Sequence, residues 1–160
     1  MAYSVVRTDL MSGTTDVAKL KSFTFETDLE NGRVVLLGGL ASGRGGEIYT
    51  ATAPAANSPL TECVLVAGVE TSYDPRFDNP DQYINKAGTA IRGYDFVHGN
   101  IFSVTTDGLD GTAAVGSVIE LQADTKFKVV AEATEGSTVV GEVIALDQVG
   151  TKTFVAIKIK

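Results

Sequence analysis

The fold is decided by three runs near the end of the chain: Lys126-Phe127-Lys128-Val129-Val130, Val139-Val140-Gly141-Glu142-Val143-Ile144 and Thr153-Phe154-Val155-Ala156-Ile157-Lys158-Ile159. β-Branched and aromatic residues are frequent in all three, as they are in β-strands. Turn signals separate the runs at Glu135-Gly136-Ser137 and Gln148-Val149-Gly150. This alternation of strand-like runs and turns predicts closely spaced final strands, with Val155, Ile157 and Ile159 packed inward.

Similar strand-like runs occupy much of the preceding chain. They lie at residues 22–27, 33–37, 47–52, 63–69, 90–96, 101–105 and 117–121. Asn31-Gly32 between the first two runs is a strong hairpin signal. Many short strands separated by glycine turns predict a mainly β fold, a single-domain β-sandwich or β-barrel-like body with at most short helices.

The middle of the chain has a different composition. All four prolines fall between Pro54 and Pro80, so we expect a loop-rich insertion over residues 53–89. Asn79-Pro80 predicts an N-cap and a first-turn proline for one short helix over residues 80–87. Residues 1–20 are expected to form an N-terminal arm, with one helical turn capped near Thr14. No second-domain boundary is evident, so residues 1–160 are predicted to be one β domain.

Charge and hydropathy exclude several classes of partner. The formal net charge is −7, from 20 acidic and 13 basic residues, and no basic cluster is present. Direct nucleic-acid binding needs such a cluster, so it is disfavoured. Docking on an anionic membrane is disfavoured for the same reason. Neither a signal peptide nor a membrane-spanning run is recognisable, and we expect a protein made in a cytoplasm.

Groups suited to catalysis are scarce. The chain has one His, one Cys and no Trp. Cys63 lies in a strand-like run and is expected to be a buried, unreactive thiol. His98 lies at a turn, with no Gly-x-Ser-x-Gly motif to fix a nucleophile for it. These features predict a protein that is not an enzyme and has no catalytic residues, although paired carboxylates of the glycosidase type are not ruled out by sequence.

The glycine-rich segment at residues 37–46 resembles a phosphate-binding loop only in composition. A P-loop needs Gly-Lys-Ser/Thr and a helix after it, whereas here a strand-like run follows. We expect a glycine-bent loop. Arg44 at its tip is able to anchor a carboxylate on a partner protein.

Two acidic clusters could suggest calcium. Asp74, Asp78 and Asp81 do not have EF-hand spacing, and Asp107 with Asp110 lacks the closing Glu of such a loop. Turn formation by Asp side chains explains both clusters more simply. We therefore expect no metal site and no cofactor.

An interface is the better prediction for the middle of the chain. Tyr73, Arg76, Phe77 and Tyr83 are residue types enriched at protein interfaces. Together with Arg44 and the N-terminal arm, they are the candidate contact residues. An equally simple interpretation is that the aromatic residues hold an irregular loop on the sheet.

A family resemblance adds to this interpretation. The stretches Asn85-Lys86-Ala87-Gly88-Thr89-Ala90-Ile91-Arg92-Gly93-Tyr94 and Val140-Gly141-Glu142-Val143-Ile144-Ala145-Leu146-Asp147 resemble head decoration (capsid cement) proteins of tailed bacteriophages. The second stretch is similar to the closing strand pair of small β decoration proteins. The likeness extends over most of the chain without a diagnostic motif.

The resemblance implies a structural virion protein. Such a protein binds the major capsid protein on the outer capsid surface, often as a homotrimer, and stabilises the shell. An alternative is a carbohydrate- or receptor-binding β module of a virion appendage. A small trimeric hydrolase of the dUTPase type ranks last, because its glycine-rich nucleotide motifs are missing.

Overall fold

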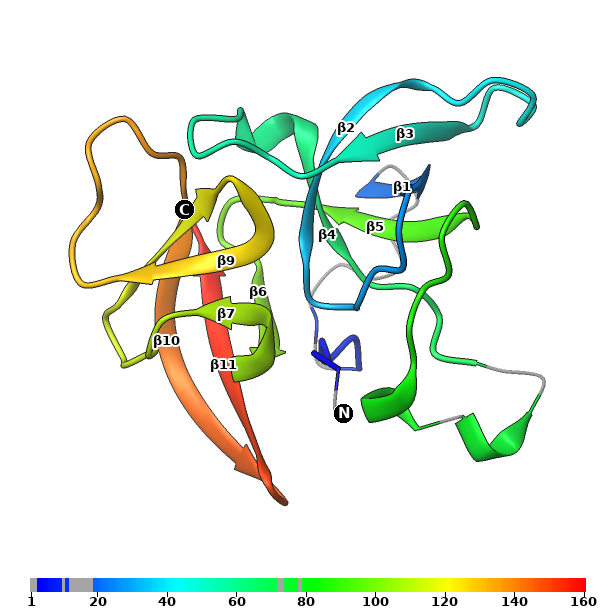
Figure 1. Cartoon of the computed structure of the whole chain (residues 1–160). Coiled ribbons are helices and arrows are strands. Elements are labelled where there is room, and N and C mark those ends of the chain that lie inside the picture. The colour runs from blue at the N-terminus through cyan, green and yellow to red at the C-terminus, as the bar shows by residue number, and fades with distance from the viewer. Residues whose placement is uncertain (1–2, 10, 12–18, 72–73, 78) are drawn as a thin grey trace.

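Two β-sheets make up the chain. The computed structural model describes residues 3–9, 11, 19–71, 74–77 and 79–160. Its strands are β1 (Leu20–Thr24), β2 (Val34–Leu40), β3 (Ile48–Thr52), β4 (Cys63–Val66), β5 (Ile91–Asp95), β6 (Ile101–Thr105), β7 (Leu109–Asp110), β8 (Val118–Gln122), β9 (Asp124–Val130), β10 (Val139–Val149) and β11 (Lys152–Ile159). A closed barrel has the order β1-β3-β2-β4-β5, and a six-stranded sheet has the order β6-β11-β10-β8-β9-β7 (Figure 1). The predicted mainly β, barrel-like body is confirmed.

Strand β4 explains how the two sheets share a core. All four of its residues are buried. Cys63 and Leu65 belong to a large apolar cluster with residues of the six-stranded sheet, whereas Val64 and Val66 belong to the cluster inside the barrel. Successive side chains of a strand point to opposite faces, so a continuous apolar run is required here. The prediction that this run crosses the core is confirmed.

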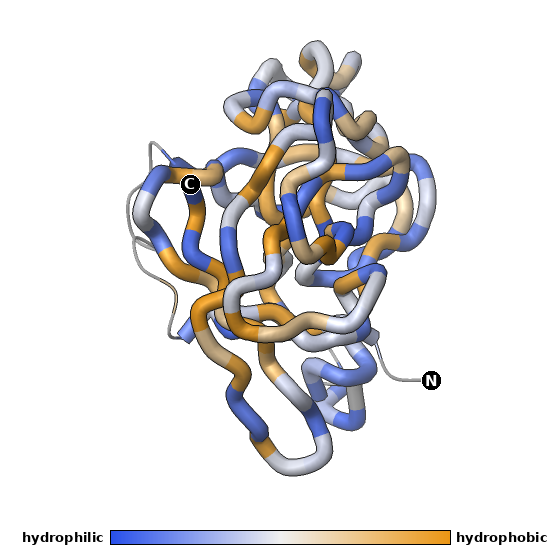
Figure 2. The backbone as a smooth tube through the Cα atoms, turned by 90° about the vertical axis from the view of Figure 1, so that its left-hand side faces the viewer, coloured by the Kyte–Doolittle hydropathy of each residue, from blue (hydrophilic) through white to orange (hydrophobic). Residues whose placement is uncertain are grey.

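The barrel interior is small and tightly filled. Phe23 of β1 and Ile91 of β5 are almost completely buried in it. A Cβ atom on Gly93 would come within 2.6 Å of a Val64 methyl group, so only glycine fits at this point of β5. Figure 2 shows hydrophobic and hydrophilic positions alternating along much of the chain.

The final strands form the centre of the second sheet. β11 pairs with β10 on one side and β6 on the other. Val155 and Ile157 are fully buried and Ile159 is 5% exposed, which confirms the predicted inward set. Phe96, Phe102 and Phe127 pack around this core with ring centroids 5.7–6.2 Å apart.

The predicted hairpin at Asn31-Gly32 is wrong, although the turn is right. Gly32 has φ +74°, the left-handed conformation that such a turn requires. The strands on either side do not pair: β1 pairs in parallel with β3 and antiparallel with β5. The chain leaves β1 and crosses to β2 by a longer path, along which Leu29 forms a bridge with Asn85. Local turn signals do not specify which strand becomes the neighbour.

Two other sequence predictions change in extent. The short helix predicted over residues 80–87 is a single 3₁₀ turn, η4 (Pro80–Gln82), because the chain then becomes extended to pair with Leu29. Its predicted cap is confirmed, since Asn79 Oδ1 accepts the Asp81 N–H. The loop predicted over residues 38–46 begins later, because β2 continues through Leu40. The helical turn predicted near Thr14 lies outside the described residues.

The predicted N-terminal arm is present in the described residues 3–9. Val6 forms a bridge with Val104 of β6, and the Arg7 N–H donates to the Ser103 carbonyl. The Arg7 guanidinium then lies 5.4 Å from the centre of the Phe154 ring and 3.1 Å from Asp147. The arm is therefore tied to three strands of the six-stranded sheet.

Candidate functional site

The loop-rich insertion predicted over residues 53–89 contains β4 and one 3₁₀ turn, η2 (Leu60–Glu62), before it. The part between β4 and β5 carries most of the predicted contact residues, and we call this part the insertion. Its described part contains two 3₁₀ turns, η3 (Pro75–Phe77) and η4. Proline fixes the first position of each turn, which restricts the backbone without a sheet ladder. In Figure 1 these turns lie at the lower right, away from the six-stranded sheet's β9 edge. Side-chain contacts therefore add to the few backbone hydrogen bonds, such as the Leu29–Asn85 bridge, that hold the segment on the body.

A buried asparagine pair supplies the first of these contacts. Asn31 is 2% exposed and Asn85 is 3% exposed. Asn31 Oδ1 accepts hydrogen bonds from Asn85 Nδ2 at 2.9 Å and from the Gly68 N–H at 2.8 Å. Asn85 Nδ2 also donates to the Leu29 carbonyl at 2.9 Å. The asparagine pair thus joins the start and the end of the insertion to the turn before β2.

Two ionisable groups border the asparagine pair. Burial raises the pKa of the Glu70 carboxyl, the hydrogen bond from Asn31 lowers it in part, and the charge of Asp81 raises it again. Burial also raises the pKa of the Tyr83 hydroxyl, with a further contribution from Glu70. Tyr83 donates to Asn85 Oδ1 at 3.3 Å. The polar contacts therefore continue from the buried pair toward the surface.

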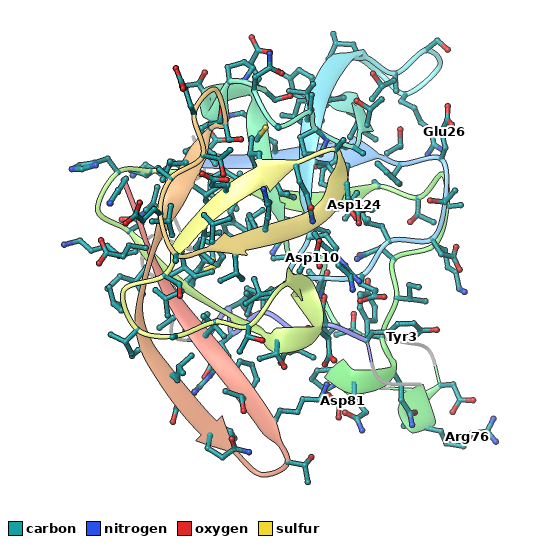
Figure 3. All side chains as sticks on the ribbon, turned by 60° about the vertical axis from the view of Figure 1, so that its left-hand side comes forward. Tyr3, Glu26, Arg76, Asp81, Asp110 and Asp124 are labelled. Atoms are coloured by element: carbon teal, nitrogen blue, oxygen red, sulfur yellow. The ribbon has the colours of Figure 1, made fainter. Side chains whose placement is uncertain are left out.

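Lys152 holds the second 3₁₀ turn of the insertion, η4. Its side chain is 16% exposed, and its Nζ lies 3.1 Å from Asp81 Oδ1 and 3.4 Å from Asp107 Oδ2. The same Nζ donates to the Tyr3 carbonyl at 3.3 Å. The Tyr3 N–H donates to the Asp81 carbonyl at 3.0 Å. Figure 3 shows Tyr3 beside the turn that carries Asp81. We call this set of contacts, formed by Lys152, Asp81, Asp107 and Tyr3, the lysine clasp.

Arg76 is a highly exposed candidate contact residue. Its side chain is 83% exposed and points outward in Figure 3. The guanidinium contacts both carboxylate oxygens of Asp74, with Nε 3.0 Å from each. The hydrogen bonds from Arg76 lower the pKa of Asp74, and Asp74 raises the pKa of Arg76. Asp74 thus orients the arginine on the surface.

Arg44 lies elsewhere. It is on the exposed loop between β2 and β3, and its Nη2 donates to the Gly88 carbonyl at 2.6 Å. It borders a groove of about 520 Å³ at the end of the barrel, together with Phe25, Glu26 and threonines of β1 and β3. Figure 1 shows this hairpin at the top and η3 and η4 at the bottom. The structure does not gather Arg44 and Arg76 into one patch.

The remaining candidates have different positions. Tyr83 is half-buried and supports the asparagine pair, which fits the interpretation that it holds the loop. Phe77 ends η3. Tyr73 lies outside the described residues. Of the other aromatic residues in this region, Tyr94 is 7% exposed and belongs to the core.

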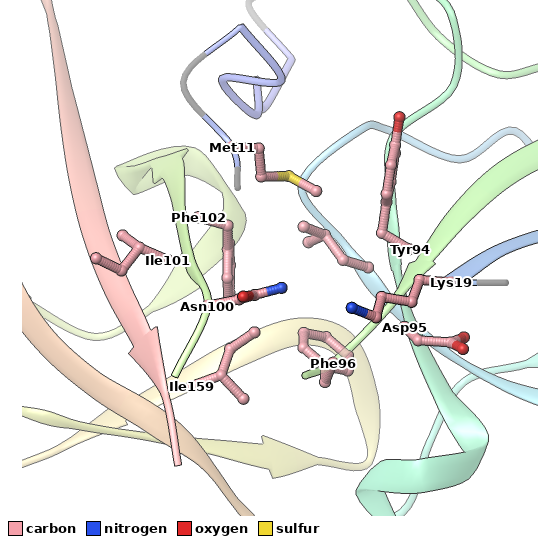
Figure 4. A pocket seen from close by; sticks show the side chains of 10 residues that line it. Met11, Lys19, Tyr94, Asp95, Phe96, Asn100, Ile101, Phe102 and Ile159 are labelled. Atoms are coloured by element: carbon pink, nitrogen blue, oxygen red, sulfur yellow. The ribbon is translucent and has the colours of Figure 1, made fainter. Parts of the chain in front are cut away.

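A small pocket lies between the two sheets, lined by Tyr94, Phe96 and Phe102 among others (Figure 4). Its volume is about 20 Å³. That is room for a single water-sized probe, far below the several hundred Å³ of a cofactor pocket. This pocket is therefore a packing defect and not a ligand site.

The candidate reactive groups are separated in space. Cys63 is 1% exposed, and burial followed by the charge of Glu62 raises the pKa of its thiol to about 11. The predicted burial of this thiol is confirmed. His98 is exposed at the turn after β5. Among the described residues no three His, Cys, Asp or Glu side chains form a group that could hold a metal ion. Within the same residues, the search for helices able to span a membrane finds none.

Sequence reasoning missed the residues that hold the insertion. Asn31 signals only a turn, Asn85 lies in no recognisable motif, and Lys152 looks like an ordinary strand lysine. Their partners are distant along the chain. Asn31 contacts Gly68, 37 residues away, and Asn85 contacts Asn31, 54 residues away. Lys152 contacts Asp81 and Asp107, which are 71 and 45 residues away. A single sequence contains no signal for such pairs.

The chain was compared with known proteins. No protein-family model matches it, and the search of curated proteins found no significant match.

Proposed function

We propose that this protein is a structural virion protein that binds the outer surface of a tailed-phage capsid and stabilises the shell. The observation that carries the proposal is the fixed, irregular insertion. Asn85 and Lys152 hold it on a rigid double-sheet body while it presents the exposed, oriented guanidinium of Arg76. A pre-ordered surface of this kind binds a partner without a large ordering cost.

The charge of the chain supports an outward location. At −7, the protein would be repelled by the packaged genome on the inside of a shell and tolerated on the outside. The proposed partner is the major capsid protein, and the proposed assembly is a homo-oligomer, with the resemblance implying a trimer. No enzymatic activity, cofactor or nucleic-acid contact is part of the proposal.

Mass action explains how such binding would stabilise a shell. A protein that bridges neighbouring capsid subunits binds the assembled state and not the separated subunits, so it shifts the equilibrium toward assembly. Repeated contacts on a symmetric shell add avidity. The candidate contacts are Arg76, Phe77 and Tyr73 from the middle of the sequence and the N-terminal arm, with Arg44 as a separate contact, while Tyr83 hydrogen-bonds Asn85.

A shell-stability measurement tests the proposal. Expanded tailed-phage capsids are heated with and without the purified chain, and disruption is followed by light scattering. We expect the disruption temperature to rise with added protein until binding saturates. Arg76→Glu should reduce the effect, whereas Lys158→Glu, the same charge change on an exposed position of β11, should not. An unchanged disruption temperature with wild-type protein would contradict the proposal.

The groove beside Arg44 favours a second candidate, a carbohydrate- or receptor-binding module. The groove has a volume of about 520 Å³ and is bordered by Phe25, Arg44, Glu26 and threonines. These side chains can stack on a polar ligand and form hydrogen bonds with it. A glycan array tests this candidate. A reproducible hit that Arg44→Ala removes would support it, and an array without hits would count against it.

A further inference from the structure

Strand β10 is longer than the strand that covers its outer side. β8 pairs only with the part from Val139 to Glu142. The last contacts on this side are made by Val143, whose N–H donates to Ser117 and whose carbonyl accepts from Gly116. β11 continues on the other side to Val149. Within the described part of the chain, residues 144–149 therefore have a free outer edge, at the hairpin that projects downward in Figure 1.

This free edge has little of the usual protection against strand pairing. Natural edges carry Lys, Pro, inward-pointing charges or bulges. Residues 144–149 contain no Lys or Pro, and the one bulge lies at the start of the edge, between Val143 and Ala145. Ile144 is 39% exposed, Leu146 is 44% exposed and Val149 is 48% exposed. An exposed apolar edge strand is a template for a further strand.

The nearly neutral composition of this edge makes a second copy of this chain a suitable occupant. The molecule has a net charge of −7, so most contacts between two copies would be repulsive. Asp147 is the single charged residue of the edge, and Arg7 lies 3.1 Å from it. Two such edges can meet without bringing unpaired like charges together.

The turn of the hairpin sets which backbone groups face outward. Val149 and Lys152 pair on either side of Gly150 and Thr151, and residues that flank a two-residue turn form a hydrogen-bonded pair. Antiparallel ladders alternate, so the N–H and C=O groups of Leu146 and Gln148 point away from β11. These groups are available to a second strand.

We propose that two copies of the chain pair antiparallel through residues 144–148, about a two-fold axis at Leu146. In this register Leu146 faces Leu146 of the second copy, and Asp147 faces Ala145. An axis at Asp147 would instead place two carboxylates opposite each other, which is unfavourable. The proposal does not depend on capsid binding. It predicts a dimer where the family resemblance implies a trimer.

Sedimentation velocity on the full chain, from micromolar to millimolar concentration, tests the assembly. The expected result is a concentration-dependent species of twice the monomer mass. Leu146→Glu should abolish it and leave a monomer with the wild-type circular dichroism spectrum. Leu40→Glu is the matched control, because Leu40 is an exposed leucine (55%) on β2, away from the edge. This variant should remain a dimer. A wild-type monomer or trimer, or a dimer that survives Leu146→Glu, would overturn the proposal.

Cysteine cross-linking tests the register. Hydrogen-bonded partners in an antiparallel pair have Cα atoms about 5.5 Å apart, which suits a disulfide. Leu146→Cys should therefore give a covalent dimer under mild oxidation with glutathione disulfide. Val149→Cys lies off the proposed axis and should not form a covalent dimer. The wild type is the negative control, because its single cysteine, Cys63, is buried. Equal cross-linking of both variants, or none at Leu146→Cys, would contradict this register.

Discussion

The ammonium group of Lys152 lies 3.1 Å from Asp81 Oδ1, and this contact joins the first residue of β11 to the second 3₁₀ turn of the insertion. Asp81 is far from Lys152 in the sequence and belongs to a segment without a sheet ladder. Because β11 is central in its sheet, the contact transfers the rigidity of the sheet to the insertion. A candidate binding surface is thereby fixed before any partner arrives.

Lys152→Met should loosen the insertion. The alkyl chain is kept while the contacts to Asp81, Asp107 and the Tyr3 carbonyl are lost, so we expect the free energy of unfolding to fall by about 1–2 kcal/mol. Hydrogen exchange of the Tyr3 amide, which donates to Asp81, should accelerate. Lys86→Met is the control, since the Lys86–Asp28 pair is largely exposed, and it should leave this exchange unchanged. Unaltered protection of Tyr3 in Lys152→Met would refute the role of the clasp.

The contact between Asn85 and Gly68 can be tested with two single variants and their combination. Asn85→Ala removes two buried hydrogen bonds and should cost about 1–3 kcal/mol of stability. Gly68→Ala should also be costly in the wild type, because its Cβ would lie 1.9 Å from Asn85 Oδ1. In the Asn85→Ala background the same change should cost much less, since the obstructing side chain is gone. Chemical denaturation of the four proteins measures the coupling, and strictly additive costs would disprove it.

Much of the fold could be predicted from the sequence because its signals are local. The final strands show β-branched runs and turn residues, and the buried run at β4 is continuous because that strand faces two cores. The parallel pairing of β1 with β3 could not be predicted in this way. Asn31-Gly32 specifies a turn, whereas the choice of neighbouring strand depends on distant residues such as Asn85.

The candidate site was predictable only in outline. Two of the four prolines, Pro75 and Pro80, lie on this irregular segment, and so does exposed Arg76. Tyr83 supports the segment through its hydrogen bond to Asn85. Arg44 lies away from the segment, beside the groove at the end of the barrel. Lys152 has no local signal at all, because its role comes from acidic groups that folding brings to it.

Glu70 makes stability depend on pH. Its pKa is raised on folding, chiefly by burial, so the folded state binds this proton more tightly than the unfolded state. The ionised carboxylate therefore costs stability above the raised pKa, and this cost disappears as the pH falls through it. Glu70→Gln should be more stable than the wild type at neutral pH. The difference should shrink toward about pH 4, near the ordinary pKa of Glu. Thermal melts of both proteins from neutral pH to about pH 4 measure this difference in stability. A difference that does not change with pH would contradict the role of Glu70.

The Cys63 thiol should be unreactive in the native protein. Burial raises its pKa to about 11, and the thiolate is the reactive form. At about pH 8, an aromatic disulfide reagent should label less than a tenth as fast in native protein as in denaturant. Rapid labelling of native protein with retained circular dichroism would contradict the buried position of this strand.

Co-sedimentation with expanded tailed-phage capsids tests the central claim most directly. Capsids that lack decoration protein are mixed with the purified wild-type chain at micromolar concentration and pelleted, and the bound chain is quantified against the major capsid protein. The account predicts saturable binding at a fixed ratio of chain to capsid subunit, reduced by Arg76→Glu. Absence of the chain from the capsid pellet at saturating concentration would contradict it.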